Sequence, residues 1–204
     1  HPALLALSMM DPEQPNAEKL VQKHLPHARA EFRMTYVKAL LNARRESDAK
    51  AQLQSIRVQN PDYPDVWLIE GALALQEGQL DSAERQLKKY LDLTNTDVTS
   101  AQYAEFRRGR TQAFLSMAQI AQQRKDFMQA DTWLQQVDNP DDVMRAQIRR
   151  AVLMAQQGQL ETALALIHSQ PERNTDEAQL KRSAEVQLLK DHKQFERART
   201  LLQL

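Results

Sequence analysis

The sequence predicts an all-α protein assembled from repeated antiparallel helix hairpins. Alanine, leucine and glutamine, which form helices readily, are abundant, whereas aromatic residues make up only 5% of the 204 residues and glycine occurs four times. Apolar residues recur at helical spacing along most of the chain. A short pattern of apolar and turn residues also returns about every 34 residues, which indicates a repeat architecture.

The clearest feature of each repeat is an alanine that has a leucine or isoleucine four residues later, so that both side chains share one helical face. These alanines are Ala49, Ala83, Ala130, Ala163 and Ala198. Their spacings are 34, 47, 33 and 35 residues, and the long interval contains thirteen additional residues. A helix, a tight turn and a second helix fit within 34 residues, so each repeat is predicted to be one helical hairpin.

Turn residues separate the predicted helices. Gly78 and Gly158 each end a helical run, as expected for the left-handed residue that closes a helix. Pro61, Pro140 and Pro171 fall between repeats, where a proline stops one helix before the next begins. The turn of the first repeat has arginines where a glycine is common, and the last turn is expected to be a residue or two longer than the others.

These features predict one incomplete unit followed by five hairpins. In the incomplete unit, residues 1–29, Ala3–Met10 is expected to be the tail of a helix, and Asn16 to cap a helix that ends at His24. Because no proline interrupts residues 101–124, the third hairpin is expected to have an extended first helix there. The apolar residues at the C-terminal end suggest that the repeats continue in a longer protein. The hairpins are predicted at residues 30–63, 64–97, 98–140, 141–174 and 175–204.

Composition argues against several functions. The 27 basic and 27 acidic residues give a net charge of zero, which does not favour nucleic-acid binding. The chain has no cysteine, no stretch of about 18 apolar residues that could span a membrane, and no glycine-rich phosphate loop or nucleophile elbow. His24 and His27 flank Pro26, so they do not share a helix face as a metal-binding pair would. We therefore predict a non-catalytic protein without a metal site or a cofactor.

Basic residues cluster at 44–45, 107–110 and 149–150. Acidic residues lie nearby in the sequence, such as Asp141 and Asp142 for the last cluster. We interpret all three clusters as solvated faces whose charges pair locally.

The hairpin pattern over about residues 30–204 resembles the tetratricopeptide repeat family. In the second hairpin, Trp67 stands for the family's large residue early in the first helix, and Gly71 for the small residue where the helices cross. Gly78 provides the turn and Leu87 the large residue of the second helix. The resemblance implies a right-handed superhelical solenoid whose first helices line a concave groove, which commonly binds peptides or partner helices. These are packing positions, so they imply a fold and no activity.

Carried onto this chain, the groove positions of the family form an apolar face with amide groups at its edges. They fall on the first helices of four hairpins: Met34, Lys38, Leu41 and Asn42; Leu68, Ala72, Leu75 and Gln76; Leu115, Gln119, Gln122 and Gln123; Ile148, Val152 and Gln156. Apolar side chains would contribute burial energy, and the amides could hydrogen-bond the backbone of a bound segment. Family members that grip a C-terminal carboxylate use a set of Lys, Asn and Arg residues. Lys38 lacks its counterparts in the following hairpin, so no such binding is expected.

The resemblance predicts a scaffold that binds a protein or peptide segment in this groove, and two alternatives remain. The repeats could present substrate within a larger enzyme, such as a glycosyltransferase or a peptidase. They could also be a self-assembly module that pairs through terminal helices near Ala3–Met10 and Gln194–Leu204. The Ala/Gln/Leu-rich composition with Asp-Pro and Asn-Pro turns resembles that of bacterial envelope repeat proteins. A bacterial periplasm or cell-envelope location is therefore favoured over the cytoplasm.

Overall fold

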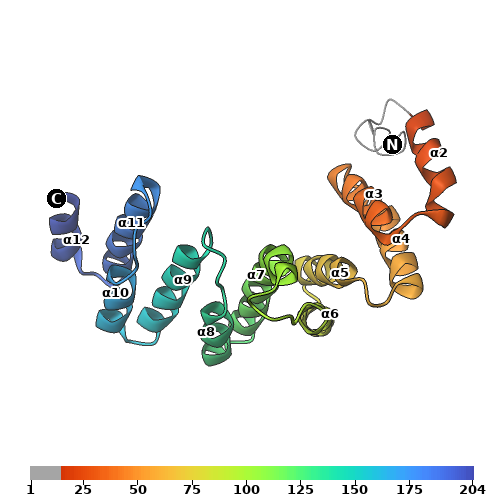
Figure 1. The fold of residues 1–204 in the computed structure, drawn as a ribbon. Helices are drawn as coiled ribbons and strands as arrows, with labels where there is room; N and C mark the ends of the chain where they lie inside the picture. Colours follow the sequence, from red (N-terminus) through yellow and green to blue (C-terminus); the bar gives the residue numbers. More distant parts are fainter. Residues whose placement is uncertain (1–14) are drawn as a thin grey trace. The chain divides into compact units, whose positions relative to one another are not determined.

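The structure, a computed structural model, describes residues 15–204 (Figure 1). These residues form eleven α-helices and one short 3-10 turn, and no strand occurs among them. The helices follow one another as consecutive hairpins, which confirms the predicted all-α hairpin fold. The chain divides into two compact units, with the boundary between Asn95 and Thr96.

Unit 1, the part before this boundary, contains a short helix followed by two hairpins. Its described elements are α2 (Pro15–His24), the 3-10 turn η1 (Leu25–His27), α3 (Ala30–Asn42), α4 (Glu46–Gln59), α5 (Pro64–Gln76) and α6 (Leu80–Leu93). Helix α2 ends at His24 as predicted but begins at Pro15, one residue before the expected cap. The helical tail predicted at Ala3–Met10 lies outside the described residues.

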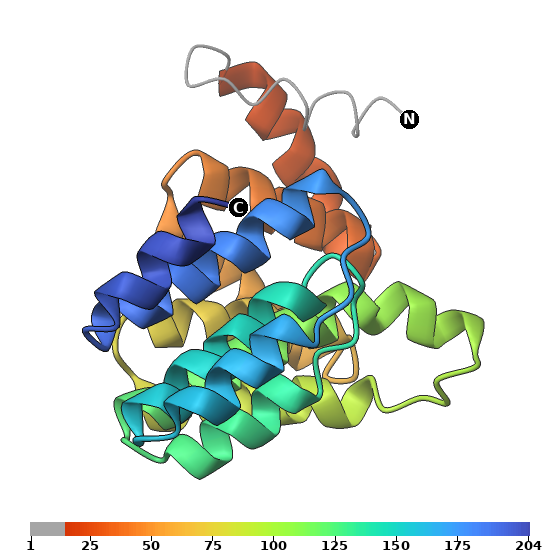
Figure 2. The same ribbon diagram turned by 90° about the vertical axis from the view of Figure 1, so that its left-hand side faces the viewer.

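Unit 2 contains three hairpins, whose helices run as successive antiparallel pairs in the green-to-blue part of Figure 2. They are α7 (Ala101–Gln123), α8 (Phe127–Gln135), α9 (Val143–Gln156), α10 (Leu160–His168), α11 (Thr175–Asp191) and α12 (Phe195–Leu202). Helix α7, with 23 residues, is the extended helix that the sequence predicts. Each of the five ranges predicted to be a hairpin holds one pair of helices.

All five hairpins close with the same kind of turn, in which three residues separate the two helices. The middle residue has a positive φ in every case: Arg44 (59°), Gly78 (76°), Lys125 (60°), Gly158 (85°) and Lys193 (60°). Backbone hydrogen bonds across the helix end accompany it. In the fourth hairpin, the N–H of Gly158 donates to the carbonyl of Ala155 and that of Gln159 to the carbonyl of Met154, both at 3.0 Å. This pairing is the Schellman motif, which satisfies carbonyls that the end of a helix leaves unpaired.

The last turn corrects one expectation. It spans residues 192–194 and is no longer than the others. The longer spacing of the final repeat is accommodated in α11, which has 17 residues. A three-residue turn with one left-handed residue is thus retained even where lysine or arginine must adopt the left-handed conformation.

Small residues allow the two helices of each hairpin to approach closely. The five repeat alanines, each five residues after the left-handed residue, are at most 1% exposed. Gly71 of α5 is buried, and a Cβ atom at this position would lie 2.8 Å from Cγ of Leu87 on α6. This distance is too short for two carbon atoms, so a larger residue would require Leu87 or one of the two helices to shift. The prediction that Gly71 lets the helices pack closely is confirmed.

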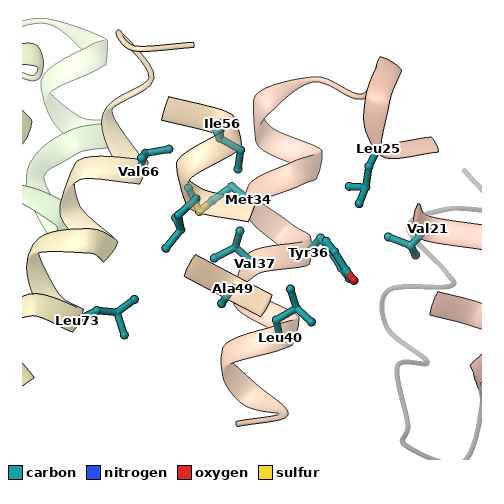
Figure 3. Close-up of a cluster of buried hydrophobic side chains, with 11 residues drawn as sticks. Val21, Leu25, Met34, Tyr36, Val37, Leu40, Ala49, Ile56, Val66 and Leu73 are labelled. Atoms are coloured by element: carbon teal, nitrogen blue, oxygen red, sulfur yellow. The ribbon is translucent and has the colours of Figure 1, made fainter. Parts of the chain in front are cut away.

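The core of unit 1 joins α2 and η1 to the first hairpin and to α5 (Figure 3). Val21 and Leu25 pack against Tyr36, which Figure 3 shows directed from α3 toward α2. The Tyr36 hydroxyl donates to Oε1 of Glu18 at 2.9 Å, and Nη1 of Arg45 lies 2.6 Å from the same oxygen. Glu18 therefore fastens α2 both to α3 and to the turn that follows it.

In unit 2, the extended helix α7 is anchored at its start and near its middle. At its start, the Ser100 hydroxyl accepts the N–H of Tyr103 at 3.1 Å and caps the helix. The Tyr103 hydroxyl in turn donates to Asp138, in the loop after α8. Further along α7, the ring of Phe114 stacks on Trp133 of α8 with 6.2 Å between the ring centroids. The first turn of α7 is thus tied through Tyr103 to the loop that follows α8.

Candidate functional site

The groove residues predicted on α3 are not all available to a partner. Lys38 and Asn42 are exposed, and Leu41 is half-buried. Met34 is only 2% exposed and belongs to the core of unit 1, together with Val37 of the same helix (Figure 3). Its predicted place on a binding face is wrong, because the side chain packs inside the hairpin.

On α5, the four predicted residues form one side of the helix. Ala72 and Gln76 are exposed, whereas Leu68 and Leu75 are half-buried. Spacings of three and four residues place these side chains next to one another. The face is therefore mostly apolar, with an amide at its C-terminal end.

In unit 2, the predicted residues of α7 and α9 form a surface that we call the α7–α9 face. Half-buried residues make its base: Leu115, Gln122 and Ile148. Exposed residues surround them: Gln119, Gln123, Val152 and Gln156. Val152 is 37% exposed, so an apolar side chain is open to solvent at the middle of α9. The surface combines apolar contact area with amide groups that can donate and accept hydrogen bonds.

A cation that the sequence analysis did not assign to this face joins its two helices. Nη2 of Arg149, on α9, donates to Oε1 of Gln122, on α7, at 2.7 Å. The Arg149 side chain is half-buried, and this burial lowers its pKa below the usual value for arginine. Within residues 15–204, no carboxylate forms an ion pair with it. The α7–α9 face therefore holds a partly desolvated positive charge without a negative partner.

The ion pair of the neighbouring Arg150 shows why the sequence did not reveal the unpaired charge of Arg149. The two arginines were expected to pair with Asp141 and Asp142, which lie nearby in the sequence. Nε of Arg150 lies instead 2.7 Å from Oδ1 of Asp131, on α8 of the preceding hairpin. Asp141 lies 3.4 Å from Arg173, in the loop before α11. The ion pairs here join hairpins, so the spacing of charges along the sequence does not identify them.

The other two basic clusters also form ion pairs with residues distant in the sequence. Arg45 pairs with Asp48 at 2.8 Å, as local spacing predicts, and also with Glu18 of α2. Arg107 lies 3.8 Å from Asp138 and over the ring of Tyr103, at 5.4 Å from its centroid.

The described residues also bear on metal and membrane chemistry. Within residues 15–204, no group of three or more histidine, aspartate and glutamate side chains is placed to hold a metal ion. His24 and His27 are both exposed. None of the helices in the same part of the chain combines the length and the apolar composition that crossing a bilayer requires.

Comparisons with known proteins identify no family for this chain. No protein-family model matches the sequence, and no curated protein matches it. Among solved structures, the crystal structure of the P58(IPK) TPR domain is similar to 98% of this chain, with 16% sequence identity and a TM-score of 0.39. The chain spans 56% of the length of that structure. A likeness at this level does not bear on function.

Proposed function

We propose that the chain is a protein-interaction module that binds a segment of a partner protein along the first helices of its hairpins. The observation that carries the proposal is the α7–α9 face. Its apolar residues offer burial energy, and its amides match the hydrogen-bonding groups of a peptide backbone. The three half-buried or exposed apolar residues of this face suit contact with a protein better than chemistry: Leu115, Ile148 and Val152.

Arg149 favours a partner segment of a particular charge. Its guanidinium is half-buried and bonded only to a neutral amide, so an acidic side chain of the partner segment would compensate its charge. We therefore propose that the segment bound at the α7–α9 face contains aspartate or glutamate. The exposed residues of α3 and α5 would provide a corresponding surface in unit 1.

A matched pair of substitutions tests this proposal. Peptides are first selected from a random-sequence display library on the wild-type chain and then measured against Val152→Glu and Met128→Glu. Both substitutions place a carboxylate at an exposed apolar residue of unit 2, but Met128 is on α8, outside the α7–α9 face, and is 82% exposed. Val152 is preferable to the half-buried Leu75 and Leu115, where a charge would disturb packing.

The selected peptides are expected to contain acidic residues and to lose at least about tenfold in affinity with Val152→Glu, because a carboxylate placed one turn from Arg149 would repel an acidic segment and compete with it for that guanidinium. Met128→Glu should leave their affinity unchanged. Circular dichroism of both variants checks that the helices persist. Equal effects of the two substitutions, or peptides without acidic residues, would contradict the proposal.

A second candidate function is self-association through α12, which exposes two large apolar side chains. Phe195 is 58% exposed and Leu202 is 60% exposed. Pairing of two copies would bury this surface. Light scattering over a range of protein concentrations tests it: a mass that rises with concentration, and returns to that of the monomer with Leu202→Glu, supports pairing, whereas a constant monomer mass excludes it.

A further inference from the structure

The first helices of three hairpins carry a charged residue eight positions before the left-handed turn residue: Glu70 on α5, Arg150 on α9 and Glu185 on α11. At two of these positions the preceding second helix supplies the opposite charge. Nη1 of Arg57, on α4, donates to Oε2 of Glu70 at 3.0 Å. Oδ1 of Asp131, on α8, accepts from Arg150 at 2.7 Å. An ion pair between successive hairpins thus satisfies the charge at two of these three positions.

Glu185 has no comparable partner. Its side chain is only 12% exposed, and its Oε1 atom is buried and accepts no hydrogen bond. Counted from the turn, the residues that stand where Arg57 and Asp131 stand are Pro171 and Leu164, and neither carries a charge. A buried carboxylate oxygen without a donor is unfavourable, so this position is incomplete in the isolated chain.

Cations near Glu185 do not complete it. Nδ1 of His168 lies 3.5 Å from Oε1, but the His168 side chain is 84% exposed and forms no hydrogen bond to the carboxylate. Lys181, one turn earlier on α11, donates instead to a backbone carbonyl in the preceding loop at 3.0 Å. Arg197 of α12 is held by Glu161 of α10 at 2.7 Å. The neighbouring cations are therefore engaged elsewhere or lie mainly in solvent.

Glu185 lies in a hollow of about 520 Å³ between α10, α11 and α12. Apolar residues of all three helices line the hollow: Leu164, Ala165, Leu189 and Leu201. Glu161 and Arg197, which also line it, neutralise each other. The hollow therefore combines an apolar wall with the uncompensated negative charge of Glu185.

We propose that this hollow binds a lysine side chain of a partner protein. The methylene stem packs on the apolar wall and the ammonium donates to Oε1 of Glu185. A compact ammonium suits a single unpaired oxygen, whereas a guanidinium favours two parallel acceptors. A metal ion would need further ligands, and no group of three or more metal-binding side chains occurs in the described part of the chain. The inference concerns other helices than the α7–α9 face and does not rest on the function proposed for it.

His168 controls access to the site. Because its ring lies 3.5 Å from Oε1 and is mostly exposed, it can turn into solvent when an ammonium enters. Removing the ring therefore opens the hollow, so that His168→Ala is expected to bind lysine more tightly than the wild-type chain does. Glu185→Gln keeps the shape of the side chain and removes its charge, and is expected to abolish the preference for lysine.

The probe for the test is Nα-acetyl-lysine N-methylamide, and its norleucine counterpart is the neutral control. Both are titrated into the complete 204-residue chain, and the NMR signals of the leucine methyl groups that line the hollow are followed. The lysine compound is expected to bind with a dissociation constant on the order of millimolar, as befits so small a ligand. The norleucine compound should bind the wild-type chain at least about tenfold more weakly, and the lysine compound should bind Glu185→Gln at least about tenfold more weakly. Each change removes one charge-assisted hydrogen bond.

Glu70→Gln is the matched control, because it makes the same change at the equivalent position where the carboxylate is already paired. It should leave lysine binding unchanged and lower the urea midpoint of unfolding, since it deprives Arg57 of its partner. Glu185→Gln should keep or raise that midpoint. The proposal is overturned if the lysine compound does not bind, if norleucine or Glu185→Gln gives equal affinity, or if Glu185→Gln destabilises the chain as Glu70→Gln does.

Discussion

The turn of the third hairpin gives a direct test of how the five hairpins are closed. Lys125 has a φ of 60°, and the left-handed conformation costs a residue with a Cβ atom about 1–2 kcal/mol. Glycine avoids this cost, but its greater freedom in the unfolded chain offsets about 0.4–1 kcal/mol of the gain. Lys125→Gly is therefore expected to raise the free energy of unfolding by about 0.5–1 kcal/mol.

Two companion substitutions separate the backbone effect from the loss of a side chain. Lys125→Ala removes the side chain and retains Cβ, so its effect should be close to zero. Gly158→Ala makes the reverse change at the equivalent turn of the next hairpin, where φ is 85° and an added Cβ would meet no atom within 4 Å. With no steric clash to add, Gly158→Ala should cost about 1 kcal/mol from backbone conformation alone.

Urea denaturation followed by circular dichroism measures all three variants. The midpoint should rise for Lys125→Gly and fall for Gly158→Ala, without a change in the slope of the transition. In a thermal melt, Lys125→Gly should raise the midpoint by about 2 °C. A lower midpoint for Lys125→Gly, or an unchanged one for Gly158→Ala, would refute the argument that these residues bear a left-handed cost.

Three further predictions concern packing and charge. Gly71→Ala should lower the free energy of unfolding by about 1–3 kcal/mol in urea, because its Cβ would lie 2.8 Å from Cγ of Leu87. Arg33 is 5% exposed, and no acidic residue in the described part of the chain pairs with it. Arg33→Met removes this buried charge but keeps the packing of the side chain, so it should keep or raise the thermal midpoint. Arg33→Ala also removes the packing and should lower the midpoint. A hydrogen bond from Arg197 lowers the pKa of Glu161, so the stability that this pair contributes is present above the usual glutamate pKa and is lost as pH falls. The protection of α12 amides against hydrogen exchange, measured relative to the unfolded chain, should therefore fall in acid, and Arg197→Gln should remove this fall.

The sequence predicted the parts of the fold that depend on local chemistry. The left-handed turn residues and the buried repeat alanines lie at fixed separations, so spacing alone located Ala83 and Gly78 correctly. The same spacing placed the first turn at residues 44–46, where arginines stand instead of a glycine, and the structure shows that Arg44 is the residue that adopts the left-handed conformation. The long helix α7 could be predicted because no proline interrupts its residues.

Contacts between successive hairpins could not be predicted in this way. The partner of Arg150 lies 19 residues away, on a helix whose packing no local pattern specifies. Met34 illustrates the same limit, because a helical face can be assigned from spacing but its exposure depends on which helices cover it. Glu185 could have been identified by aligning the turns of the five hairpins in the sequence. It would then stand out as a charged residue eight positions before a left-handed turn residue whose counterpart on the preceding hairpin is uncharged.

The constant length of the hairpin turns has a consequence for protein engineering. All three N–H groups of each turn donate hydrogen bonds to backbone carbonyls, so an inserted residue would break a closed set of bonds. The connections from one hairpin to the next are four to seven residues long and vary among themselves. Reporter domains or epitope tags grafted into these connections should leave every hairpin folded, whereas the same graft within a turn should uncouple its two helices.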